Sequence, residues 1–178
     1  MEQIRIHGRG GQGSVTMASM LAKAAFETGK HAQGFPSFGV ERLGAPIQAF
    51  VRIDEREITD RSQIDNPDYV IVQDSSLIEL VDVTEGLKDD GMIIINTSEK
   101  ANSIDLKTDA EIVTVDATDI ALEHLGKPIM NTALAGAFAK ATGLIERESM
   151  GKVIRETFEG EIGEKNVKAM EEAYEVLE

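Results

Sequence analysis

The chain has 178 residues and a formal net charge of −14, from 18 Lys and Arg against 32 Asp and Glu. This length suits one domain with a single core, expected over residues 1–178. The acidic balance argues against a nucleic-acid partner, because a phosphate backbone requires a basic surface. No stretch approaches the roughly 20 apolar residues of a membrane span, so we expect a soluble, cytoplasmic protein with no membrane partner.

The absence of cysteine excludes further classes of chemistry. A chain without Cys forms no disulfide, offers no thiol nucleophile and ligates no iron–sulfur cluster through sulfur. His7, His31 and His124 are far apart in sequence and show no metal-ligand spacing. We therefore predict no catalytic and no metal-ligating residue in this chain, and we interpret His7 as a hydrogen-bonded histidine at the end of a strand.

The chain opens with a predicted strand, a glycine turn and a helix. Apolar alternation from Ile4 leads into Gly8-Arg9-Gly10-Gly11-Gln12-Gly13, and a helical pattern follows from Ser14 to about Thr28. Glycine adopts left-handed backbone and lets a ligand approach closely, and the N–H groups of a helix start carry partial positive charge. The turn therefore suits a phosphate. The candidate cofactor-binding residues are Arg9, Gly10, Gly11, Gln12 and Gly13.

The same glycines permit other interpretations. Gly8, Gly10 and Gly13 fit the spacing of a dinucleotide-binding turn. A nicotinamide site usually adds an acid about 20 residues later for the ribose, but residues 30–38 carry none, and Pro36 limits a strand there. Three interpretations stay open: a nicotinamide site, glycines that only let helix pack on strand, and a loop that meets a phosphate, a partner subunit or both.

The next segment, Gly34–Pro46, holds three glycines, two prolines and two phenylalanines, which block long regular structure. Its apolar side chains need burial, although Glu41-Arg42 places charges among them. It is either a loop folded onto its own core or a docking surface. The preceding helix is apolar almost all round, which indicates a second layer or a partner chain over it. The candidate interface residues are Phe35, Phe38, Glu41, Arg42 and Gly44.

The middle of the chain alternates apolar runs with helix-capping residues. Residues 47–53 read as a half-buried strand, and Ile58 as the start of another short one. Three continuous β-branched runs end at Asp74, Asn96 and Asp116. Helical patterns follow the first and the third of these runs, at 77–81 and 120–125.

This rhythm predicts a Rossmann-like α/β domain, with a mostly parallel sheet and helices on both faces. Ligands of such sheets bind at the carboxyl ends of the strands, where Asp74, Asn96 and Asp116 should cluster beside the glycine turn. Capping and turn formation also account for these three residues. The last third reads as helical, over residues 131–142, 149–158 and 164–177.

Four motifs give the chain a family resemblance. The glycine turn Gly8–Gly13 and the segment Phe35–Pro46 resemble the gamma subunits of 2-oxoacid:ferredoxin oxidoreductases, as do Pro67–Asp74 and Asn131–Ala137. The likeness covers nearly the whole chain. Within that family the second motif is similar to the pyruvate or the branched-chain type, and the 2-oxoglutarate type is more distant. We expect the pyruvate type, with a 2-oxoisovalerate or 2-oxoglutarate complex as the alternative.

The resemblance implies a subunit that does not catalyse alone. Such complexes convert a 2-oxoacid and coenzyme A into an acyl-CoA and CO2, and they use thiamine diphosphate and [4Fe–4S] clusters to reduce ferredoxin. The thiamine diphosphate and the clusters are implied on the alpha, beta and delta partner subunits, and none on this chain. The role implied for this chain is assembly and help with coenzyme A. A purely structural subunit is the alternative. Leu43 departs from the family pattern, which suggests an arginine beside Arg42.

Overall fold

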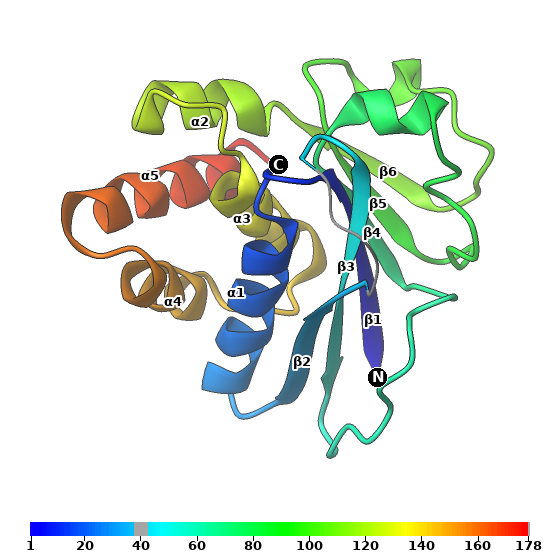
Figure 1. Ribbon diagram of the computed structural model, residues 1–178, viewed down its shortest axis with the longest axis horizontal. Helices are drawn as coiled ribbons and strands as arrows, with labels where there is room; N and C mark the ends of the chain where they lie inside the picture. Colours follow the sequence, from blue (N-terminus) through cyan, green and yellow to red (C-terminus); the bar gives the residue numbers. More distant parts are fainter. Residues whose placement is uncertain (38–42, 178) are drawn as a thin grey trace.

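The computed structural model describes residues 1–37 and 43–177, which are built around one six-stranded sheet with the order β2-β3-β1-β4-β5-β6 (Figure 1). The strands are β1 (Glu2–Arg9), β2 (His31–Pro36), β3 (Pro46–Asp54), β4 (Tyr69–Val72), β5 (Met92–Asn96) and β6 (Glu111–Val115). Strands β1, β4, β5 and β6 pair in parallel, whereas β3 is antiparallel to both β1 and β2. The prediction of a mostly parallel sheet is confirmed.

The α-helices pack on one face of this sheet (Figure 1). They are α1 (Ser14–Glu27), α2 (Ala117–Leu125), α3 (Asn131–Thr142), α4 (Arg147–Thr157) and α5 (Gly160–Val176). Their apolar sides meet alternate residues of the strands, such as Ile4, Ile6, Val51, Ile71 and Ile94, in the main core. The helical C-terminal third is thus confirmed. Within the described residues, no helix is long and apolar enough to cross a bilayer.

Helices were expected on both faces, but the opposite face carries loops and two short 3-10 helices, η1 (Ser75–Glu79) and η2 (Ala101–Ser103), in place of α-helices. A smaller core there joins Val70, Val72 and Ile93 to Leu77 and Val83. The helical pattern expected at 77–81 is therefore realised only as the short η1. Two carbonyl groups of the loop after η1 accept hydrogen bonds from β1.

The donor is Arg5, which together with His7 occupies this second face of β1. Arg5 Nη2 donates to the carbonyl oxygens of Val83, at 3.2 Å, and of Glu85, at 2.5 Å. Arg5 Nε donates to His7 Nε2 at 3.0 Å, and His7 is 2% exposed. Burial first, and then the Arg5 charge, lower the pKa of His7 to about 3, against a smaller opposing effect of Asp82. His7 is thus a hydrogen-bonded residue, as expected, although it lies two residues inside the strand.

Strand β2 ends at Pro36, as expected of a proline that limits a strand, and it includes only the first three residues of the segment Gly34–Pro46. The expectation of a short strand starting at Ile58 is wrong. Pro36 is tolerated because β2 is an edge strand. Gly34 is required there because a Cβ would lie 2.5 Å from the Ala18 carbonyl oxygen of α1. Ile58 is not in a strand: its side chain is 8% exposed, and its carbonyl oxygen accepts a hydrogen bond from Gln33 Nε2 at 2.9 Å.

Candidate functional site

The glycine turn connects the end of β1 to the start of α1. Gly11 and Gly13 have φ angles of 95° and 76°, a conformation that disfavours side chains, which explains the glycines at both positions. Gly13 is the N-cap of α1 and makes no side-chain cap. The N–H groups of Ser14, Val15 and Thr16 therefore lack an intrahelical acceptor, and no acidic residue occupies the first turn. These donors give the start of α1 a partial positive charge, which is suited to an anion.

The turn is held by the segment that follows the undescribed residues. Gly10 N donates to the Ala45 carbonyl oxygen at 2.9 Å, and Gly44 N donates to the Gly10 carbonyl oxygen at 3.0 Å. A β-bridge pairs Gly10 with Leu43, whose side chain covers Gly11 and is 90% exposed. The turn and residues 43–45 thus form one local unit.

Arg9 connects this unit to η1. Its Nε pairs with Asp74 Oδ2 at 2.9 Å, its Nη1 donates to the Gly44 carbonyl oxygen at 3.0 Å, and its Nη2 donates to Ser76 Oγ at 2.8 Å. We call this set of contacts the Arg9–Asp74 clamp. Arg9 was predicted to contribute its charge to a phosphate site. Here its charge is balanced by Asp74, and its described contacts position the turn.

Asp74 is saturated with hydrogen-bond donors. Besides Arg9, it accepts from Gln12 Nε2 at 3.3 Å and from the Ser76 N–H at 3.1 Å. Burial raises the pKa of Asp74, but the hydrogen bonds from Ser76 and Arg9 outweigh it, and the pKa lies below the ordinary value. The carboxylate therefore stays charged and fully engaged.

The position of Asp74 bears on the nicotinamide alternative. Strand β4 is the parallel neighbour of β1, and Asp74 follows its end. A dinucleotide-binding fold places its ribose-binding acid at the end of the second strand of the unit. In this chain β2 and β3 lie between β1 and β4 in sequence. The acid at the end of the neighbouring strand therefore lies much farther from the glycine turn than the usual spacing of about 20 residues. Because its oxygens already accept from the clamp, Asp74 has little capacity left for a ribose.

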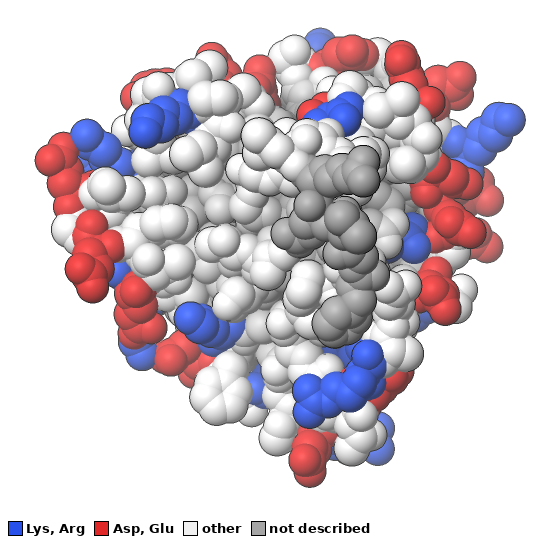
Figure 2. Space-filling model, in the orientation of Figure 1, with Lys and Arg blue, Asp and Glu red and all other residues white. Residues whose placement is uncertain are grey.

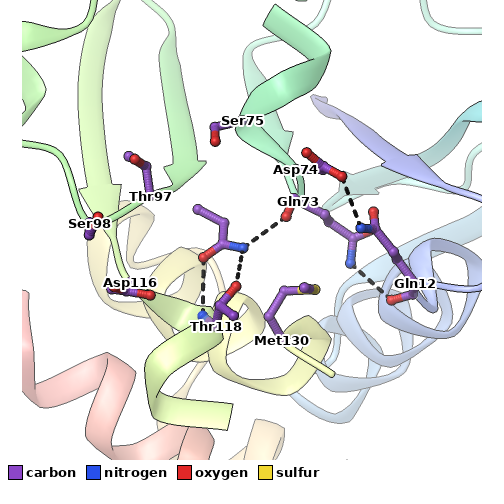
Figure 3. Close-up of a pocket in the computed structure, with 10 residues that line it drawn as sticks. Gln12, Gln73, Asp74, Ser75, Thr97, Ser98, Asp116, Thr118 and Met130 are labelled. Carbon is purple, nitrogen blue, oxygen red and sulfur yellow. Dashed lines mark hydrogen bonds between the residues drawn. The ribbon is translucent and has the colours of Figure 1, made fainter. Parts of the chain in front are cut away.

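A polar pocket of about 350 Å³ opens beside the turn, at the carboxyl ends of β4, β5 and β6 (Figure 3). The predicted cluster of Asp74, Asn96 and Asp116 near the turn is confirmed, since all three line this pocket with Gln12. The remaining lining residues are Gln73, Ser75, Thr97, Ser98, Thr118 and Met130. Asp74 and Asp116 also cap η1 and α2, as capping predicted.

An amide network fixes the floor of the pocket. Asn96 Nδ2 donates to the Gln73 carbonyl oxygen at 2.9 Å and to Thr118 Oγ1 at 2.8 Å, while the Thr118 N–H donates to Asn96 Oδ1 at 3.2 Å. Gln73 Nε2 donates to the Gln12 carbonyl oxygen at 3.4 Å (Figure 3). Ser14 Oγ, at the start of α1, donates to Gln73 Oε1. The pocket is thus continuous with the glycine turn.

The chemistry of the pocket differs from that of the helix end. Its charged lining side chains, Asp74 and Asp116, are acidic, so a phosphate is repelled inside it. The side-chain hydroxyl groups of the pocket and the Asp116 carboxylate suit a ligand's hydroxyl or amino groups. Residues 1–37 and 43–177 bring no three His, Cys, Asp or Glu side chains together as a metal site. Of these two parts of the site, the start of α1 is the one suited to an anion.

The structure describes two of the five predicted docking residues, Phe35 and Gly44. Phe35 packs on Phe50 with ring centroids 5.4 Å apart, beneath the Arg52 guanidinium at 5.3 Å, so much of its surface is used internally. Gly44 is exposed and its carbonyl oxygen accepts from Arg9. Phe38, Glu41 and Arg42 lie outside the described residues.

Sequence reasoning missed the roles of Gln73, Ser76 and Asp74 around the turn. The distance in sequence hid them: 65 residues separate Arg9 from Asp74, and only the pairing of β1 with β4 brings the two together. The one available signal was the run of hydrogen-bonding residues, Gln73 to Ser76, directly after a buried strand.

Comparison with known proteins places this architecture in a family. Residues 3–176 match the family model described as pyruvate ferredoxin/flavodoxin oxidoreductase. The chain is 56% identical to pyruvate synthase subunit PorC of Methanothermobacter thermautotrophicus, over 100% of this chain and 97% of that one. It is also 56% identical to the common subunit gamma of pyruvate/ketoisovalerate oxidoreductases of Pyrococcus abyssi, over 98% and 96% of the two chains.

A solved structure shares the fold. The crystal structure of pyruvate oxidoreductase subunit PORC from Thermotoga maritima superposes with a TM-score of 0.86 at 40% identity, over 98% of this chain and 95% of that one. The agreement extends over the glycine turn, the sheet and the C-terminal helices, because nearly the full length of each chain is covered. The chain therefore belongs to the pyruvate ferredoxin/flavodoxin oxidoreductase family.

Proposed function

We propose that this chain is the gamma subunit of a pyruvate:ferredoxin oxidoreductase and that its glycine turn binds a phosphate group of coenzyme A. The subunit role is supported by the relatives of the same length that carry the names PorC and gamma. The ligand role depends on one observation, the uncapped start of α1 behind Gly11 and Gly13. A helix end with free N–H groups and no nearby acid in its first turn is suited to a phosphate.

The rest of the site limits which part of the ligand fits where. The acidic pocket beside the turn disfavours a second phosphate, but it offers acceptors for hydroxyl and amino groups of the same ligand. Gln12 and Arg9 hold the turn: Gln12 Oε1 accepts from the Arg9 N–H at 2.7 Å. In this proposal Gly11, Gly13 and the first N–H groups of α1 contact the phosphate, while Arg9 and Gln12 position them.

The partners proposed for the chain are the alpha, beta and delta subunits, with ferredoxin reached through the complex. Thiamine diphosphate and [4Fe–4S] clusters belong to those subunits in this proposal, and the lack of cysteine in this chain supports that division. Because one relative serves both pyruvate and ketoisovalerate oxidoreductases, a second candidate is the same role in a complex that acts on a branched 2-oxoacid.

The test is Gly11→Asp in the assembled oxidoreductase, with the dissociation constant of coenzyme A measured by calorimetry. The new carboxylate repels a phosphate at the helix start, and its Cβ meets only the flexible end of Leu43, at 2.8 Å. We expect affinity to fall at least tenfold, about 1.4 kcal/mol.

Gly126→Asp is the matched control. Gly126 also has positive φ, at 67°, and has open space around it at the end of α2, so the same charge is added at another glycine with positive φ. Unchanged coenzyme A affinity in Gly11→Asp with normal assembly would contradict the phosphate role. A lower yield of assembled complex, with unchanged coenzyme A affinity in the fraction that assembles, would instead support the purely structural subunit.

A further inference from the structure

The motif Asn131–Ala137 forms the start of α3, and this helix start is built like that of α1. Met130 is its N-cap and gives no side-chain cap, and no acidic residue lies in the first turn. The Leu134 N–H donates to the Met130 carbonyl oxygen at 2.9 Å, so the first N–H groups of α3 lack an intrahelical acceptor. Met130 lines the polar pocket together with Gln12. The start of α3 therefore lies beside the glycine turn.

The side chain of Asn131 is directed from α3 onto this turn. It is 2% exposed, and its Nδ2 lies 2.7 Å from the position that a Cβ would take at Gly13, the N-cap of α1. Its Oδ1 accepts from the Thr132 N–H at 2.9 Å, which fixes the orientation of the amide. Within residues 1–37 and 43–177, no group accepts a hydrogen bond from Nδ2. A buried amide donor without an acceptor is costly, so this side chain indicates a ligand that supplies one.

The donors around Gly13 are uncharged. Residues 10–22 and 128–139 contain no Lys, Arg, Asp or Glu, and Figure 2 shows the face over α1 largely in white. The charge of Arg9 is already balanced by Asp74. A phosphate at the start of α1 is therefore held by neutral N–H groups, among which Asn131 provides the side-chain donor.

The polar pocket on the other side of the turn distinguishes between the phosphates of coenzyme A. Coenzyme A carries a diphosphate and, on its ribose, a single 3′-phosphate. Asp74 and Asp116 in the pocket disfavour two adjacent phosphate groups at its edge. The 3′-phosphate instead has the ribose 2′-hydroxyl and the adenine amino group as neighbours, and these suit the hydroxyl groups of the pocket and the Asp116 carboxylate. The 3′-phosphate is thus the better fit.

We propose that the Asn131 amide donates a hydrogen bond to the 3′-phosphate of coenzyme A, in a site formed by the starts of α1 and α3. This inference rests on the proposed function, to which it adds a binding residue and the choice of one phosphate. It gives the motif Asn131–Ala137 a role in the site. It also makes this subunit the part of the complex that separates coenzyme A from dephospho-coenzyme A, which lacks the 3′-phosphate.

The experiment measures the dissociation constants of coenzyme A and dephospho-coenzyme A for the assembled oxidoreductase by calorimetry. The unmodified complex should bind coenzyme A at least tenfold more tightly than dephospho-coenzyme A. Asn131→Asp should weaken the binding of coenzyme A at least tenfold, because a carboxylate replaces the donor that faces the 3′-phosphate. The affinity for dephospho-coenzyme A should stay within twofold, because that ligand has no group at this position.

The variants are chosen so that a change in affinity is not a change in folding. Asn131→Asp keeps an oxygen that accepts from the Thr132 N–H, and a carboxylate in the first turn of a helix is favoured by the helix dipole. Asn131→Leu removes the donor without adding charge and should also weaken the binding of coenzyme A alone. Asn66→Asp is the matched control: it adds the same charge on an exposed residue before β4, at the edge of the sheet opposite the pocket, and should leave both affinities unchanged.

Four outcomes would overturn the inference, and the last would also remove its basis. Equal affinity of the unmodified complex for the two ligands would show that the 3′-phosphate is not bound. An equal loss for both ligands in Asn131→Asp would place a different group of the ligand at Asn131. Unchanged coenzyme A affinity in Asn131→Asp, with a loss in Gly11→Asp, would exclude Asn131 and leave the proposed function intact. Unchanged affinity in both variants would show that the proposed phosphate site itself is wrong.

Discussion

Lowering the pH from 7 to 5 is expected to destabilise this protein through one side chain, His7. In the unfolded chain a histidine takes up a proton near pH 6.5, whereas His7 in the fold stays neutral down to a pKa of about 3. The unfolded state therefore binds more protons in this range, so stability is complete above pH 6.5 and falls as the pH decreases towards 3. Integrated from pH 7 to pH 5, the loss from His7 is about 2 kcal/mol.

Urea unfolding at the two pH values measures this loss, with His7→Gln as the comparison. Glutamine does not titrate, and its carbonyl oxygen can still accept from Arg5 Nε, so the variant should lose about 2 kcal/mol less than the unmodified chain. His31→Gln alters an exposed histidine and should keep the full loss. An equal pH dependence in the unmodified chain and His7→Gln, or an NMR titration of the His7 ring near pH 6.5, would refute the reasoning.

Two further predictions concern packing and the clamp. Gly136→Ala and Gly151→Ala should shift the unfolding temperature in opposite directions. A Cβ at Gly136 would lie 2.1 Å from the Met170 carbonyl oxygen, and such overpacking costs about 1–3 kcal/mol of stability. At Gly151 the nearest atoms are 3.5 Å away, so alanine adds about 1 kcal/mol of stability through its higher helix propensity. Shifts of the same sign in the two variants would contradict this prediction. For the Arg9–Asp74 clamp, a double-mutant cycle of Arg9→Met and Asp74→Asn, measured by urea unfolding, should give a coupling free energy of about 1 kcal/mol, since both side chains are about a quarter exposed. A coupling free energy near zero would show that the contact does not stabilise the fold.

Continuous apolar segments in the sequence made much of the fold predictable. The strands at Tyr69–Val72 and Met92–Asn96 and the helix Asn131–Thr142 lie where continuous apolar residues and caps indicated. The conformation of Gly34 and Pro36 in β2 could not be predicted in the same way. It depends on an edge position in the sheet and on the close approach of α1, neither of which is a local property.

One part of the candidate site was also predictable from the sequence, and another part was not. The meeting of Asp74, Asn96 and Asp116 beside the turn followed from one rule about the carboxyl ends of parallel strands. The engagement of Asp74 by Arg9 did not, because it requires knowing which strand lies next to β1. A local sequence pattern indicates which residues lie at the carboxyl ends of the strands. Their hydrogen-bond partners depend on the order of the strands in the sheet.

The central place of β1 also has a consequence for synthesis on the ribosome. This strand emerges before both of its neighbours, which are β3, over residues 46–54, and β4, over residues 69–72. During translation β1 must remain unpaired until those segments follow, as an exposed strand that is open to association with other chains. Arg5 and His7 interrupt its apolar residues at alternate positions. The nascent strand thus carries polar gatekeepers that become the buried Arg5–His7 pair once the sheet closes.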